Sequence, residues 1–214
     1  MTDSEQVLVI ATRNKGKSAE IKGALRDFPV LVKDLNDFGP IPDPVEDGES
    51  FEENAYKKAS FTARVLGLPA LADDSGLEVE ALSGAPGVHS ARYSGLLATD
   101  LENNAKLLRE LRGKANRKAR FRCILSLAVP SGPALTYEAS CEGVILDAPR
   151  GDKGFGYDPL FLYPPLGKTF AEMSIEQKLS VSHRGLALRE LANEFDKVLQ
   201  WLLKRQAEER MRHW

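Results

Sequence analysis

A basic segment near the start of the chain has the residues needed to bind phosphate. It lies between an apolar run at 7–11 and a stretch with helical spacing at 17–27, and it reads Thr12-Arg13-Asn14-Lys15-Gly16-Lys17. Backbone amides in the first turn of a helix bind anions. The helix macrodipole is positive there, so three cations in this turn are unfavourable unless an anion lies among them. The segment therefore indicates a phosphate-binding turn, although its spacing is not that of a Walker A loop. A solvated basic helix start is the alternative.

Two adjacent carboxylates, Asp73 and Asp74, follow a short apolar strand predicted at 70–72. Adjacent acids repel each other unless they share a cation or a proton. Carboxylate oxygens suit magnesium, which uses one or two of them and completes its coordination with substrate phosphates and water. Because successive residues point in different directions, we expect one Asp to face a metal ion or water and the other to have a different role. The alternative is a turn of solvated acids at 73–76.

Charged residues around the start of the next predicted helix could complete such a site. Glu46 lies in a loop rich in Pro, Gly and Asp, and it could supply a second magnesium ligand. Lys58 lies in the helix after that loop and could neutralise phosphate charge. The spacing of these residues in the sequence is equally compatible with the alternative, in which they are solvated surface charges.

An aromatic residue between two glycines, in Gly154-Phe155-Gly156-Tyr157-Asp158-Pro159, could stack a nucleobase. A packed turn with a core phenylalanine is the structural alternative. Lys178, His183 and Arg184 precede the last predicted helix and add hydrogen-bond donors and positive charge. These segments thus supply the kinds of side chain that a nucleotide site requires.

The secondary-structure elements that must position these residues are helices and strands interspersed along the chain. Two capping boxes, Ser50 with Glu53 and Thr99 with Glu102, mark helix starts, and a Ser-Gly-Pro turn at 131–133 marks a hairpin. We expect strands at 7–11, 30–33, 70–72, 77–82, 119–129, 134–146 and 160–162. We expect helices at 17–27, at 50–66, from 99 onward and as one long C-terminal helix. The helix from 99 is expected to bury Leu101, Ala105, Leu108 and Leu111. This pattern predicts an α/β fold built on a mixed, twisted β-sheet with flanking helices.

The bulk composition restricts the possible functions further. The 214 residues are 43% hydrophobic and 28% charged, with a formal net charge of −2, which argues against non-specific nucleic-acid binding. No apolar stretch is long enough for a membrane span, and the start of the sequence does not resemble a signal peptide. Cys123 and Cys141 lie in predicted strands and are expected to be buried free thiols. We therefore expect a cytoplasmic protein that does not bind membranes or nucleic acid.

The chain resembles the inosine triphosphate pyrophosphatase family, whose members act on non-canonical purine nucleoside triphosphates. Six segments carry the resemblance in the family's order: 12–17, 50–55, 72–77, 84–87 together with 90–95, 155–159, and 182–185. The sequence departs from the family pattern at Arg13 and Lys15, where relatives often have smaller or neutral residues. It also ends in a longer charged tail.

The resemblance implies an architecture and a set of residue roles. Residues 1–203 would form one domain of two lobes with a central cleft, followed by a charged helical tail at 204–214, and the protein would be a homodimer that requires Mg²⁺. The triphosphate would be gripped by Thr12, Arg13, Asn14, Lys15, Gly16 and Lys17, helped by Lys58. Glu46 and Asp74 would hold magnesium, Asp74 would also accept a proton, and Ser75 would contact the substrate. The nucleoside would be enclosed by Phe155, Gly156, Tyr157, Asp158, Lys178, His183 and Arg184.

The expected reaction is hydrolysis of ITP, XTP or dITP at the α–β phosphoanhydride bond, which releases the monophosphate and pyrophosphate. One alternative is a Maf-like pyrophosphatase of other nucleotides, against which the Phe155 loop and the Ser-His-Arg segment argue. The other is a non-catalytic nucleotide-binding protein, which would not need acids such as Glu46 and Asp74 around a metal ion.

Overall fold

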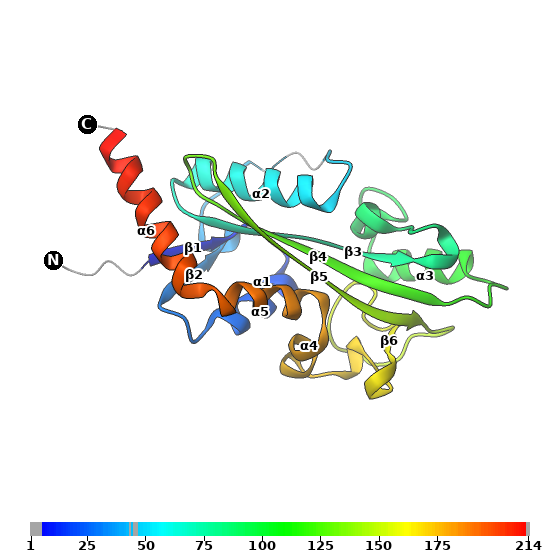
Figure 1. The fold of residues 1–214 in the computed structure, drawn as a ribbon. Coiled ribbons are helices and arrows are strands. Elements are labelled where there is room, and N and C mark those ends of the chain that lie inside the picture. Colours follow the sequence, from blue (N-terminus) through cyan, green and yellow to red (C-terminus); the bar gives the residue numbers. More distant parts are fainter. Residues whose placement is uncertain (1–5, 43, 45–46, 213–214) are drawn as a thin grey trace. The chain divides into compact units, whose positions relative to one another are not determined.

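A computed structural model describes residues 6–42, 44 and 47–212 of the chain (Figure 1). In these residues the strands form one mixed sheet of order β2-β1-β3-β4-β5-β6-β7. Strand β1 pairs in parallel with β2 and β3, whereas β6 pairs antiparallel with β5 and β7. The strands are β1 (Gln6–Ile10), β2 (Val30–Asp34), β3 (Ala70–Val79), β4 (Lys118–Ala128), β5 (Ala134–Ile145), β6 (Phe161–Tyr163) and β7 (Lys168–Thr169). The predicted α/β fold on a mixed sheet is confirmed.

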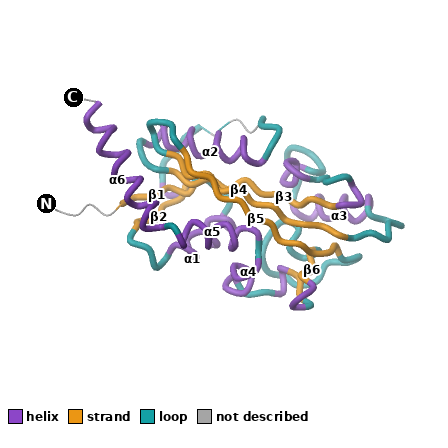
Figure 2. The backbone as a smooth tube through the Cα atoms, in the orientation of Figure 1, coloured by secondary structure: helices purple, strands orange, loops and turns teal. Residues whose placement is uncertain are grey.

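The described residues also form α-helices, which alternate with the strands along the first part of the chain and follow them at its C-terminal end. They are α1 (Lys15–Leu25), α2 (Phe51–Leu66), α3 (Asp100–Glu110), α4 (Ile175–Val181), α5 (His183–Asn193) and α6 (Phe195–Arg212). Strands β3, β4 and β5 are the long strands of the sheet, with 10, 11 and 12 residues (Figure 2).

The chain divides into two compact units. The first unit comprises the described parts of Met1–Asp74, Ile124–Glu138 and Ala187–Trp214, and the second comprises Ser75–Cys123 and Ala139–Leu186. The boundary passes between Asp74 and Ser75, inside β3. In the first unit, α2 and the part of α5 from Ala187 onward lie on different sides of the strands (Figure 1).

Each unit has its own hydrophobic core. One buried cluster of the first unit consists largely of small residues, among them Val9, Ala59, Ala63 and Ala72, which allow helices and strands to approach closely. The core of the second unit contains larger side chains: Leu77, Leu107, Phe121, Tyr157, Phe161 and Phe170. Cys123 and Cys141 are buried and are not joined in a disulfide, as predicted.

Local capping signals explain why the helices begin where they do. The Asn14 side chain accepts a hydrogen bond from the amide of Lys17 at 3.0 Å and starts α1. Ser50 accepts one from the amide of Glu53 at 3.1 Å and starts α2, although the Glu53 carboxylate binds the amide of Glu49 and so only half of the predicted capping box forms. Thr99 and Glu102 form a complete box at the start of α3.

Three expectations about secondary structure are wrong. Strand β3 runs without a break from Ala70 to Val79, so the acids at 73–76 lie within a strand and not in a turn. Of the four residues expected to be buried by the third helix, Leu101 is 77% exposed and Ala105 is exposed, whereas Leu111 is buried and Leu108 packs against the core; α3 also buries Asn103, Asn104 and Leu107. The C-terminal helix is split into α5 and α6, and it is preceded by α4, which a capping box of Ser174 with Gln177 could have indicated.

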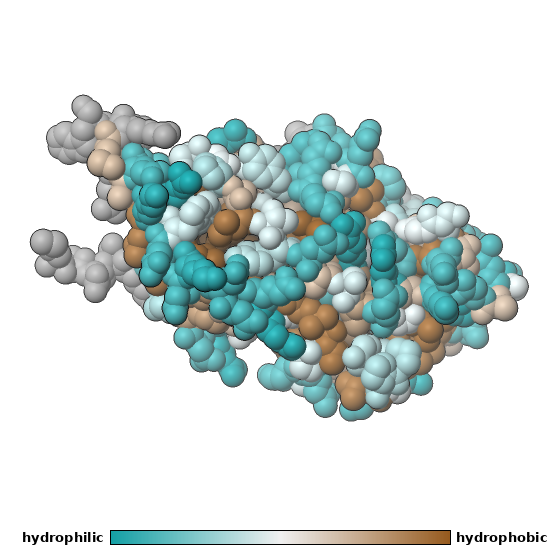
Figure 3. Space-filling view, viewed as in Figure 1, coloured by the Kyte–Doolittle hydropathy of each residue, from teal (hydrophilic) through white to brown (hydrophobic). Residues whose placement is uncertain are grey.

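Within the described residues, no helix combines the length and the apolar character that crossing a bilayer requires. The face drawn in Figure 3 is largely hydrophilic, with scattered apolar areas, which is usual for a protein surface.

Candidate functional site

Two acids and two lysines form a buried charged group in the first unit, which we call the acid–lysine group: Lys17, Lys58, Asp73 and Asp74. Lys58 Nζ lies 2.6 Å from Asp74 Oδ1 and 2.9 Å from the carbonyl oxygen of Asp73. Lys17 Nζ forms an ion pair with Asp73 Oδ1. Lys58 is only 7% exposed, and the two acids are 2% and 8% exposed. The alternative that Lys58 is a solvated surface charge is therefore wrong.

The strand geometry of β3 explains why the two acids have different partners. Consecutive residues of a strand point to opposite faces of the sheet. The Asp73 carboxylate pairs with a lysine from α1 and the Asp74 carboxylate with a lysine from α2. Two buried carboxylates can remain in the middle of a strand because each has its own cation, which offsets the cost of removing charge from water.

Asp74 has the environment of a proton acceptor or a metal ligand. Burial raises the pKa of its carboxyl above the ordinary value, and the positive charges of Lys58 and Lys17 oppose this rise without cancelling it. Among the described residues, Lys58 alone donates to this carboxylate, and it does so on Oδ1. The second oxygen is therefore available to water or to a cation.

A single carboxylate such as that of Asp74 is compatible with magnesium. No group of three or more His, Cys, Asp or Glu side chains in the described part of the chain could hold a metal ion. Magnesium needs no such group, since one or two carboxylates suffice when phosphate and water supply the other oxygens. Asp74 meets this requirement, whereas Asp73 is paired with Lys17. Glu46, the other predicted ligand, lies outside the described residues.

The predicted phosphate-binding turn joins β1 to α1 and ends at the acid–lysine group. The amide of Asn14 donates to Thr12 Oγ1 at 3.1 Å, and the Asn14 side chain caps α1. The first turn of α1 contains no acidic residue, so its positive end is not neutralised by its own sequence. Asn14 and Lys15 are exposed. Direct contact of residues 12–17 with phosphate remains a prediction.

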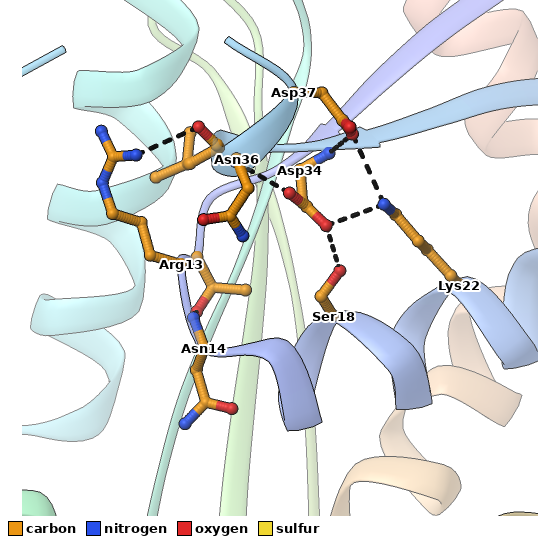
Figure 4. Close-up of polar contacts among 9 residues, drawn as sticks. Arg13, Asn14, Ser18, Lys22, Asp34, Asn36 and Asp37 are labelled. Atoms are coloured by element: carbon orange, nitrogen blue, oxygen red, sulfur yellow. Dashed lines mark hydrogen bonds and ion pairs between the residues drawn. The ribbon is translucent and has the colours of Figure 1, made fainter. Parts of the chain in front are cut away.

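Arg13 takes a position that the sequence did not suggest. Its Nη1 donates to the carbonyl oxygen of Leu35 at 3.2 Å, and its Nη2 donates to that of Ile41 at 3.3 Å. Nearby, Ser18 and Lys22 on α1 both point at Asp34, the last residue of β2 (Figure 4). Arg13 thus connects the turn to the segment that follows β2.

A second group of side chains, which we call the aromatic–cationic group, lies in the second unit: Phe155, Asp158, Lys178 and Arg184. Lys178 Nζ lies 2.5 Å from Asp158 Oδ2 and 4.6 Å from the centroid of the Phe155 ring. The Arg184 guanidinium carbon lies 5.7 Å from the same centroid. These distances are those of cation–π contacts. Phe155 is half-buried, so the alternative of a core phenylalanine describes it only in part.

Glycine at 154 is required by the geometry of this group. Gly154 has φ +75°, and a Cβ atom there would lie 2.0 Å from Asp158 Oδ2. The same carboxylate oxygen accepts the amide of Phe155 at 3.0 Å. Asp158 therefore shapes the loop that presents the aromatic ring, and it also binds Lys178.

The remaining predicted nucleoside contacts have varied surroundings in the second unit. Tyr157 belongs to the hydrophobic core, and its hydroxyl donates to the carbonyl oxygen of Ser90 at 2.8 Å. Arg184 Nη2 donates to Ser75 Oγ at 3.4 Å. His183 is buried and stacks on Phe121, with ring centroids 4.6 Å apart. Their contacts with a nucleoside remain predictions.

Several supporting residues escaped the sequence analysis. Asp100 accepts the amide of Gly156 at 2.7 Å, and Asn104 donates to the carbonyl oxygen of the same glycine at 2.9 Å. Phe121 and Phe170 lie beside His183. Asn103 and Asn104 in the helix from 99 could have indicated these contacts, because asparagines that are buried must be hydrogen-bonded to neighbouring groups.

Comparison with known proteins places these features in a family. The model of the Ham1 family matches residues 8–194. The chain is 72% identical to the dITP/XTP pyrophosphatase of Syntrophobacter fumaroxidans, over 96% of this chain and 89% of that protein, and 56% identical to one from Thermus thermophilus, over 86% and 89%. Among solved structures, the HAM1 protein from Coxiella burnetii superposes with a TM-score of 0.82 at 41% identity, covering 90% of this chain and 99% of that one. The Staphylococcus aureus Ham1 protein gives 0.79 at 40% identity, with the same coverage.

Proposed function

Because this chain belongs to the Ham1 family, we propose that it is a pyrophosphatase of the non-canonical purine nucleotides ITP, XTP and dITP. The relatives named above are dITP/XTP pyrophosphatases. The observation that carries the proposal is the acid–lysine group, in which the buried Asp74 carboxylate keeps one oxygen available beside two lysines. Phosphoryl transfer needs such positioned charge more than it needs a covalent nucleophile.

In the proposed reaction, the oxygen of a water molecule attacks the α-phosphorus. The bond between that phosphorus and the oxygen that bridges to the β-phosphorus breaks, and pyrophosphate leaves with the electron pair. Asp74 takes the proton of the attacking water, which its raised pKa favours. Lys17 and Lys58 balance negative charge on the phosphate oxygens.

We also propose that Asp74 and Glu46 hold Mg²⁺, which when bound would neutralise phosphate charge. The amides at the start of α1, together with Lys15, would bind the triphosphate. Lys17 and Lys58, which pair with the two acids of β3, would balance further negative charge on the phosphates.

The aromatic–cationic group is proposed to select the base. Phe155 would stack on the purine, and Arg184 or a loop amide would donate to the 6-keto oxygen that hypoxanthine and xanthine share. Adenine carries an amino group at that position, so a buried donor would be left unpaired at a cost of about 1–3 kcal/mol. Guanine has the keto oxygen but adds a 2-amino group, and a steric or donor–donor conflict there would reject it.

A pyrophosphate-release assay on ITP, XTP, dITP, GTP and ATP, with and without Mg²⁺, tests the proposal. We expect release from the first three only, and only with the metal. A Maf-like enzyme would release pyrophosphate from other nucleotides, and a sensor would bind nucleotide without releasing it. We further propose that the protein is cytoplasmic and forms a homodimer. Light scattering after size-exclusion chromatography would measure the mass of the dimer.

A further inference from the structure

We propose that Arg13 is a positioning residue, which holds the phosphate-binding turn at 12–17 against the segment at 35–41 and does not itself bind the triphosphate. The inference rests on the proposed function, because it concerns the turn proposed to bind the phosphates. Its starting point is the pair of hydrogen bonds from the two terminal nitrogens of one guanidinium to the carbonyl oxygens of Leu35 and Ile41.

These two acceptors suit arginine and no other cationic side chain. They lie six residues apart in the chain, on the 3-10 turn Leu35–Asp37 and on the loop beyond it. The planar guanidinium presents several donors in a fixed fork, whereas the lysine ammonium is a point charge on a flexible stem. A lysine at position 13 would keep the positive charge but could not hold both carbonyls in the same way.

Helix α1 is also attached to Asp34, the residue immediately before this segment, on the other side of the turn. Ser18 Oγ donates to Asp34 Oδ2, and Lys22 Nζ lies 2.7 Å from the same oxygen (Figure 4). Asp34 is 6% exposed, and its other carboxylate oxygen accepts the amide of Asn36 at 2.8 Å. The turn at 14–17, which is proposed to bind phosphate, is thus held by Arg13 before it and by Ser18 after it.

The contacts of Arg13 and Ser18 on the two sides of the turn would fix the orientation of its amides before the substrate binds. Groups that stabilise a transition state act best when they are already in place, and a displacement of about 1 Å can cost about 100-fold in rate. The contact of Ser18 with Asp34 would remain after the loss of Arg13, so the turn would become mobile without unfolding of the first unit. A positioning role therefore predicts a loss in kcat, whereas a phosphate ligand would mainly change KM.

The test compares Arg13→Met and Arg13→Lys with Lys15→Met, which removes an exposed cation from the same turn. Two quantities are measured: kcat and KM for ITP, and hydrogen–deuterium exchange of peptides covering 12–17 and 35–41 without nucleotide. We expect both Arg13 variants to lower kcat about tenfold and to raise exchange in both segments together. Lys15→Met should raise KM and leave exchange unchanged, and Arg26→Met, at the exposed end of α1, should match the wild type in every measurement.

The outcomes separate this inference from the proposed function. Full activity of Arg13→Lys, or an Arg13→Met variant that raises KM with exchange unchanged, would overturn the positioning role. Exchange that rises in both segments supports it even if the wild-type protein releases no pyrophosphate from ITP. In that case the proposed function would fail, and the mechanical link between the two segments would stand.

Discussion

Lys58 Nζ lies 2.6 Å from Asp74 Oδ1, and both side chains are almost fully buried in the first unit. A carboxylate and an ammonium at this distance stabilise each other, and the proposed function gives the same ammonium a second role at a phosphate oxygen. The pair therefore has a structural role as a buried ion pair and a proposed chemical role in catalysis. Variants of Asp74 and Lys58 can separate these two roles.

Replacement of Asp74 by Asn tests the proposed proton acceptor. An amide has nearly the same shape but cannot take a proton from water, and general-base catalysis contributes about 10²–10⁴-fold to rate. We expect Asp74→Asn to lower kcat by about that factor while circular dichroism and gel filtration stay as in the wild type. Near-normal turnover would remove Asp74 from the mechanism.

Replacement of Lys58 by Met tests the energetic role of the ion pair. Removing one partner of a buried pair leaves an uncompensated charge and costs about 3–5 kcal/mol. We expect Lys58→Met to lower the free energy of unfolding in urea by that amount. In the double variant with Asp74→Asn part of the loss should be recovered, because no charge is then left without its partner. Additive losses in the double variant would contradict the coupling.

The acid stability of the first unit should depend on Asp34. Burial of its carboxyl favours the neutral form, but hydrogen bonds from Lys22, Ser18 and the amide of Asn36 outweigh this and lower the pKa of Asp34 to about 2. Because the folded pKa is below the ordinary value of about 3.9, the stabilisation is present above about pH 4 and is lost as the pH falls toward 2.

Thermal unfolding of the wild type and of Asp34→Asn as a function of pH measures this effect. The wild type should have the higher Tm at neutral pH, and the difference should shrink between about pH 4 and pH 2. Asp27→Asn is the control, since that exposed acid makes a long contact with Arg26, 3.4 Å between Nε and Oδ2, and its Tm difference should be small at every pH. A constant difference between the wild type and Asp34→Asn would contradict the prediction.

Replacement of Phe155 by Leu tests the proposed base-stacking surface. Base–aromatic stacking is worth about 1–3 kcal/mol, so we expect KM for ITP to rise by about tenfold with little change in kcat. Inorganic pyrophosphate has no base, and its inhibition constant should therefore stay within about twofold of the wild-type value. Equal losses in ITP and pyrophosphate binding would show that the leucine disturbs the phosphate contacts and not the base.

The sequence alone determined the features that depend on neighbouring residues. The turn between β1 and α1, the cap at Thr99 with Glu102, and the hairpin of β4 and β5 follow from local periodicity, capping and turn chemistry. The order of the six family segments likewise identified the family, because each segment is short and contiguous. Such signals need no knowledge of the remainder of the fold.

Only the tertiary structure decided which charged residues are buried and what they bind. Lys58 appeared as one of several helix charges until its partner, 16 residues away, was placed beside it. Asp73 and Asp74 resembled a turn, yet they continue a strand because lysines from two helices neutralise them. The type and position of Arg13 predict a phosphate contact, and only the structure shows its hydrogen bonds to carbonyl oxygens 22 and 28 residues away. The free energy of a charged side chain depends on the dielectric surroundings and the partners that folding brings to it, and residue type and spacing do not encode either one locally.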